Sequence, residues 1–266
     1  MVRIAFLATL LLLTSCQNAP STAQKNEAVN LMPIESMLDF YAEKHIGLAL
    51  FQKTISNYPL WYHKDVSRYL AEVGSHVSMY SLRNDISYSF YIVDSKDVFS
   101  LGLPSGIVVV SLGLLEHIQT ESELACILGL EIAKIEHQYL LRIMNPAKDD
   151  FTQNWLKNSE EIANAYALVL THRFSDENIN ESDRLGMIYA QHFGYRASDL
   201  QVLLTRFYQD QIQRKSKTTY LGQYSESIVA HRQSYGEILV KELEKEQSKF
   251  PTRKNRFDSY KPFLTK

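Results

Sequence analysis

A segment with helical spacing, Glu123 to Tyr139, holds the residues whose types could do chemistry. It reads E-L-A-C-I-L-G-L-E-I-A-K-I-E-H-Q-Y and places the carboxylate of Glu131 three residues before the ammonium of Lys134. Such a carboxylate can act as a general base when a metal ion activates a water molecule beside it. A helical zinc clamp needs two histidines at positions i and i+4, with the glutamate after the first. No pair among the eight histidines of this chain has that spacing.

The same segment also has a simple structural interpretation. An apolar stripe follows one side of the helix, made of Leu124, Ile127, Leu128 and Ile135. Glu131 and Lys134 would then form an i, i+3 ion pair of the kind common on exposed helix faces. Taken alone, the segment favours this amphipathic helix over an active site.

The elements around this helix predict an α+β fold that is mostly helical, with one small β-sheet. Helical spacing runs from Leu31 to about Ser81 and again beyond Leu114. Two β-rich runs, Ile86–Val93 and Gly106–Leu112, flank a turn signal and predict a hairpin or meander.

The order of features across this region resembles metallopeptidase family forty-eight, which includes the CAAX-prenyl endopeptidases and bacterial periplasmic lipoproteins. Leu103 to Lys134 reads L-P-S-G-I-V-V-V-S-L-G-L-L-E-H-I-Q-T-E-S-E-L-A-C-I-L-G-L-E-I-A-K. In that family a turn rich in Pro and Gly precedes a strand closing in G-L-L, then E-L-A and the zinc helix. The resemblance implies a zincin-like metallopeptidase fold over residues 31–266, with zinc as the family cofactor.

The resemblance also locates the family's zinc site on this chain. Its three metal-ligand positions fall on Leu130, Lys134 and Ile179, and its catalytic base falls on Glu131. A structural zinc site contributes about 10–16 kcal/mol of binding free energy through its ligands, and these three side chains supply none of it. The expected cofactor is therefore none, and Glu131 is a retained base position without an activated water to serve.

Two further blocks carry the resemblance. Ile179 to Gly186 reads I-N-E-S-D-R-L-G, in which Asp183 matches an aspartate that supports a zinc-binding histidine in active relatives. The stretch S-I-V-A-H-R-Q-S-Y-G-E-I matches the family at His231, a second supporting position, but Arg232 replaces the family's proline.

Removal of a metal would leave Glu131 and Asp183 facing a site without a dication, and unpaired buried carboxylates cost several kcal/mol each. We therefore predict that Lys134 Nζ lies within salt-bridge distance of Glu131 or Asp183. The alternative is a lysine whose ammonium extends to solvent.

A metal site rebuilt from other histidines is a separate alternative. It would bring His137, His172 and His231 together with Glu131.

The N-terminus resembles a lipoprotein export signal. Residues 1–15 hold one cation and an apolar run too short to span a bilayer, and they end in L-T-S before Cys16. We expect acylation of Cys16, a tether over residues 16–30, and an outer-membrane location facing the periplasm, because Gln17 stands where an inner-membrane retention signal would place aspartate. The alternatives are a plain signal peptide and inner-membrane retention. Cys126 is then expected to be a small buried hydrophobe.

Three functions follow from these observations. The first is a pseudopeptidase, anchored in the membrane by lipid, that binds or regulates envelope proteins in outer-membrane quality control. The second is an active zinc metalloendopeptidase with an atypical site, and the third is a structural envelope lipoprotein. The net charge of −2 gives no electrostatic reason to expect nucleic acid as a partner.

Overall fold

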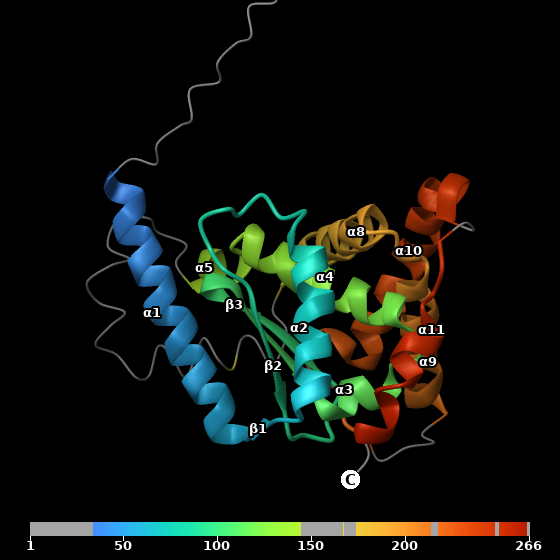
Figure 1. The fold of residues 1–266 in the computed structure, drawn as a ribbon. Helices are drawn as coiled ribbons and strands as arrows, with labels where there is room; N and C mark the ends of the chain where they lie inside the picture. The colour runs from blue at the N-terminus through green and yellow to red at the C-terminus, as the bar shows by residue number, and fades with distance from the viewer. Residues whose placement is uncertain (1–33, 145–166, 168–173, 214–217, 248–249, 265–266) are drawn as a thin grey trace, which may run out of the picture. The chain divides into compact units, whose positions relative to one another are not determined.

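A small β-sheet with helices on both of its faces forms the centre of the fold (Figure 1). The computed structural model describes residues 34–144, 167, 174–213, 218–247 and 250–264. These residues belong to one compact unit that begins at Ile34. The predicted signal segment, the tether with Cys16, and His172 lie outside the described residues.

The helices follow in chain order. They are α1 (Ile34–Asn57), α2 (Lys64–Ser78), α3 (Leu112–His117), α4 (Glu121–Glu136), α5 (Tyr139–Met144), α8 (Asp176–His192), α9 (Asp199–Ile212), α10 (Glu226–Gln247) and α11 (Lys254–Asp258). Short 3-10 turns occur at Pro104–Gly106, Gly222–Tyr224 and Lys261–Phe263. The expectation of an α+β, mostly helical chain with one small sheet is confirmed.

The sheet has four strands in the order β1-β2-β4-β3: β1 (Leu60–Trp61), β2 (Ser89–Val93), β3 (Ser100–Leu103) and β4 (Ile107–Ser111). β2 pairs with β4 in parallel, whereas β1 and β3 pair antiparallel to their neighbours. The predicted hairpin or meander between the two β-rich runs is therefore wrong. The hairpin joins β3 to β4 through the Pro104–Gly106 turn, where Ser105 and Gly106 both have positive φ.

Strand β4 separates the two parts of the hydrophobic core. Val108 and Val110 pack with α2 and α4 on one face, and Ile107 and Val109 pack with α1 and α5 on the other. This alternation explains why β4 reads as a continuous apolar run, since a strand buried on both faces needs no polar side.

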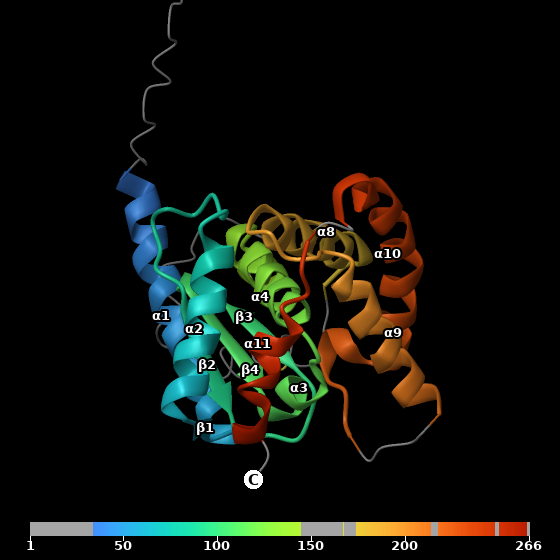
Figure 2. The ribbon, with the colours of Figure 1, turned by 45° about the vertical axis from the view of Figure 1, so that its right-hand side comes forward.

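Helix α4 lies at the centre of the domain, between the sheet and helices α8 and α9 (Figure 2). Thr120 begins it, because its Oγ1 accepts from the N–H of Glu123 at 3.1 Å as an N-cap. Every residue from Glu121 to Ile135 is buried, so the amphipathic interpretation of this helix is wrong. Gly129 faces Gly186 of α8 so closely that a Cβ on Gly129 would lie 2.7 Å from the Gly186 carbonyl oxygen.

Among the described residues, no helix is both long enough and apolar enough to cross a bilayer.

Candidate functional site

Glu131 and Lys134 point into the protein from α4, and neither reaches bulk solvent. Glu131 is 0% exposed and Lys134 is 6% exposed. Lys134 Nζ lies 3.0 Å from Glu131 Oε1, so the predicted salt bridge to Glu131 is confirmed and the solvent-extended lysine is wrong. Asp183, the other predicted partner, pairs elsewhere.

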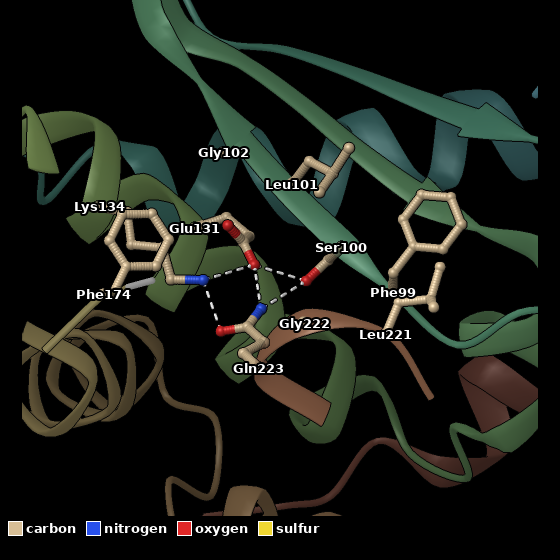
Figure 3. A pocket seen from close by; sticks show the side chains of 10 residues that line it. All are labelled: Phe99, Ser100, Leu101, Gly102, Glu131, Lys134, Phe174, Leu221, Gly222 and Gln223. Atoms are coloured by element: carbon tan, nitrogen blue, oxygen red, sulfur yellow. Dashed lines mark hydrogen bonds and ion pairs between the residues drawn. The ribbon is translucent and has the colours of Figure 1, made fainter. Parts of the chain in front are cut away.

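Three donors from three elements converge on Glu131 Oε1 (Figure 3). Ser100 Oγ of β3 donates to it at 2.5 Å, Lys134 Nζ at 3.0 Å, and Gln223 Nε2 of the Gly222–Tyr224 turn at 2.5 Å. Gln223 Oε1 in turn accepts from Lys134 Nζ at 2.5 Å. The ammonium and the amide thus form a closed cluster with one oxygen of the carboxylate, and such pairing lowers the cost of burying these charges.

A second buried ion pair lies beside the first. Arg232 of α10 donates through Nε and Nη2 to the two carboxylate oxygens of Asp183 on α8, at 2.8 and 2.7 Å. Its Nη1 donates to the backbone oxygen of Gln223 at 3.0 Å, which connects the two pairs. Both members are buried, and the fork geometry is the strong, bidentate form of this interaction. Two carboxylates are thereby balanced by two cations.

Tyr224 completes the connection between the pairs. Its hydroxyl lies 2.7 Å from Ser100 Oγ, and the Arg232 guanidinium lies 5.4 Å from its ring centroid. Burial, reinforced by the nearby charge of Glu131, raises the pKa of Tyr224 well above its usual range. The phenol therefore stays protonated and can act as a hydrogen-bond donor.

The two cations respond differently to burial. Burial lowers the pKa of Lys134, and the attraction of Glu131 offsets only part of this effect. Burial would also lower the pKa of Arg232, but the charge and hydrogen bonds of Asp183 outweigh it and raise the pKa. Arg232 is the permanent charge of the site.

A cavity of about 10 Å³ opens beside Glu131, lined by residues of β3, α4 and the turn at Gly222. It has room for about one water molecule. Glu131 Oε2 is buried without a hydrogen-bond partner among the described residues, and it lies close to the Cα of Gly102. A larger substrate does not fit this space unless the surrounding segments move.

The outer edge of β3 is only partly open. The Ser111 N–H donates to the backbone oxygen of Phe99 at 3.1 Å. Along antiparallel strands, hydrogen-bonded residue pairs alternate with pairs that are not hydrogen-bonded. Ser100 and Gly102 therefore direct their backbone groups away from β4. Just before β3, Val98 is hydrogen-bonded on both its N–H and its C=O to the segment Thr219–Leu221, at 2.8 and 3.0 Å. The chain itself thus occupies the start of this edge.

The residues present do not fit a zinc ion. Leu130 and Ile179 are buried apolar side chains, and the ammonium of Lys134 is bound to Glu131. In addition, three hydrogen-bond donors already surround Glu131 Oε1. Across the described part of the chain, no three His, Cys, Asp or Glu side chains converge in a way that could hold a metal ion.

The remaining predicted site residues lie apart from Glu131. His231 Nε2 is 3.1 Å from Asn180 Oδ1 on α8, so among the described contacts it bonds to Asn180 and not to Asp183. His137 ends α4 and stacks on Tyr139 at 5.3 Å.

Ser100, Gln223, Tyr224 and Arg232 are the site residues that the sequence did not predict as members. Arg232 stood out only because it replaces the family's proline. An arginine at a position that should be apolar signals that a buried carboxylate lies close enough to pair with it. Gln223 and Tyr224 carry no such signal, and all four residues reach the site from segments outside α4.

Comparison of the sequence with protein-family models and with curated proteins finds no match.

Cys126 is fully buried in α4, and burial raises the pKa of its thiol well above the usual range. In a Cys16→Ser variant we therefore expect Cys126 to react with a disulfide reagent at pH 8 at least about 100-fold more slowly in the folded protein than in urea, since only the accessible thiolate reacts. The exposed Leu82→Cys in the same background is the positive control. Equal rates in the folded and unfolded protein would contradict the burial of Cys126.

Proposed function

We propose that this chain is a non-catalytic protein of the periplasm, anchored in the outer membrane through Cys16, with a zincin-like metallopeptidase scaffold. It binds or regulates envelope proteins during outer-membrane quality control. One observation carries the non-catalytic part of the proposal: the ammonium of Lys134 and the amide of Gln223 occupy the space around Glu131 where a catalytic metal would act.

The order and packing of the elements support the scaffold part. The β3–turn–β4–α3–α4 sequence places Glu131 of α4 beside the edge strand β3. Helix α8 brings Asp183 to the same side of α4, and the close Gly129–Gly186 contact fixes the distance between the two helices. This proximity of an edge strand and two facing helices is the observation that supports the scaffold part of the proposal.

The edge of β3 is the element we propose for binding a client. Ser100 and Gly102 direct backbone groups away from β4, and an extended peptide can add to such an edge through main-chain hydrogen bonds. Binding there requires the segment Thr219–Leu221 to shift, because it already covers Val98.

A structural envelope lipoprotein is the second candidate. The cavity of about 10 Å³ and the burial of Leu130 and Ile179 favour it, since a filled site has no capacity for a peptide. An active metalloendopeptidase with an atypical site has no support of this kind, because its ligands are missing.

Zinc content and proteolysis test the non-catalytic proposal. We expect the purified full-length protein to contain no stoichiometric zinc after incubation with the metal, and to leave casein uncleaved. The Glu131→Gln variant should behave identically, because a base without an activated water contributes nothing to hydrolysis. Stoichiometric zinc together with cleavage that Glu131→Gln abolishes would overturn the proposal.

A binding measurement separates the two remaining candidates. A fluorescent ten-residue peptide with the alternating pattern of an outer-membrane strand is titrated with the protein, and anisotropy is recorded. Saturable binding that an unlabelled copy competes away supports client recognition. Absence of binding at a protein concentration of about 100 μM means that the binding free energy is weaker than about −5.5 kcal/mol. This result favours the structural role.

A further inference from the structure

The segment between α2 and β2 exposes two large apolar side chains close together in sequence. Met79 is 74% exposed and Leu82 is 81% exposed. Single exposed apolar residues are ordinary on a protein surface, so two large ones on one short segment define a candidate contact surface only together with their position on the domain.

The backbone of this segment is held in place while the two apolar side chains project outward. Leu82 N–H and Ser81 Oγ both donate to Glu136 Oε2 of α4, at 2.9 and 2.8 Å. The Tyr80 hydroxyl donates to the backbone oxygen of His192 at 2.9 Å. Because these bonds fix the chain, Met79 and Leu82 are presented at little further entropic cost to a partner.

The segment lies at the end of the domain where α1 begins. Arg83 Nη2 lies 3.0 Å from Glu43 Oε2 of α1 and 2.7 Å from Asp85 Oδ2, so the segment is bound to the first half of α1. Figures 1 and 2 both show the α2–β2 connection at the same end as the start of α1. The Arg83 charge is compensated by two carboxylates and does not oppose an apolar contact.

We propose that Met79 and Leu82 insert into the lipid surface that holds the chain's own anchor. This inference rests on the proposed anchor at Cys16, which only 17 residues separate from Ile34. Such a connection spans at most about 60 Å, and it joins the domain at the end that carries these two side chains. Bilayer contact at this end would add a second attachment to the acyl anchor and hold the domain in one orientation.

Fluorescence quenching by labelled lipids tests this contact in the full-length protein. Leu82→Cys carries a polarity-sensitive nitrobenzoxadiazole label, and the protein is reconstituted in vesicles of phosphatidylethanolamine and phosphatidylglycerol containing doxyl-labelled lipid. Buried Cys126 is not available to the reagent, and Cys16 is not available when it is acylated as proposed. Tyr62→Cys is the matched control, because Tyr62 is 76% exposed and follows the opposite end of α1.

We expect the emission of the label at position 82 to shift to shorter wavelength and its fluorescence to be quenched about twofold or more. Both changes are expected for a side chain about 5–10 Å below the headgroup boundary. The Tyr62 label should show neither change. A wavelength shift without lipid quenching would mean contact with a second copy or another protein, and would overturn the proposal.

Mass spectrometry of Cys16 in the same sample distinguishes a failure of the proposed lipid contact from a failure of the proposed anchor. An acylated Cys16 with an unquenched Leu82 label refutes the lipid contact and leaves the anchor intact. An unmodified Cys16 refutes the anchor and the lipid contact together.

Discussion

Replacing Arg232 with methionine is expected to destabilise the folded protein by about 3–5 kcal/mol, because it leaves a buried carboxylate without its cation. Asp183 is 1% exposed, and Arg232 supplies both of its side-chain hydrogen bonds among the described contacts. Methionine keeps much of the volume of the side chain, so the change removes charge more than packing. Urea unfolding followed by circular dichroism measures the difference in free energy.

Two controls accompany this measurement. Arg68→Met breaks a pair with Asp65 in which both side chains are largely exposed, and should cost no more than about 1 kcal/mol. The double variant Arg232→Met with Asp183→Leu removes both charges and should recover most of the loss. If Arg232→Met alone costs under about 1 kcal/mol, the buried pair does not contribute as argued.

The substitution Lys134→Met is expected to lower the free energy of unfolding by about 3 kcal/mol, which is the lower end of the range for a broken buried ion pair. The loss is smaller than at Arg232 because Ser100 and Gln223 still donate to Glu131. The same urea titration provides the free energy of unfolding.

A double-mutant cycle isolates the charge interaction. Glu131→Gln neutralises the carboxylate with little change in shape, so the combination with Lys134→Met should be more stable than Lys134→Met alone by at least about 1 kcal/mol. Additive effects of the two substitutions would show that the 3.0 Å contact contributes no coupling energy.

The helical regions could be predicted from the sequence because apolar spacing marks them, but the burial of α4 on every side could not be predicted from its stripe. Strand β3 was missed because its four residues, Ser100–Leu103, include a serine and a glycine and are all buried, so no alternation marks them. The parallel pairing of β2 with β4 was missed for the same reason, since the hairpin partner of β4 was not recognised.

The site was predicted in part. Local spacing sufficed for the Glu131–Lys134 pair, because i and i+3 residues are neighbours on any helix. Gln223 and Arg232 lie 92 and 49 residues from their carboxylate partners. Contacts of this kind depend on how α8, α10 and the Gly222–Tyr224 turn pack on α4, which no local pattern specifies.

The interlocked cluster of Glu131, Lys134 and Gln223 also constrains how this sequence can change over time. A single substitution at any of the three leaves an uncompensated polar group, at a cost that is a large fraction of the 5–15 kcal/mol typical of a whole domain. A sequence that keeps this fold is therefore expected to change the three positions jointly or to keep all three. Replacing Lys134 with histidine would remove the ammonium that pairs with Glu131, so a change toward a metal ligand at this position would lower the stability of the fold before any metal could bind.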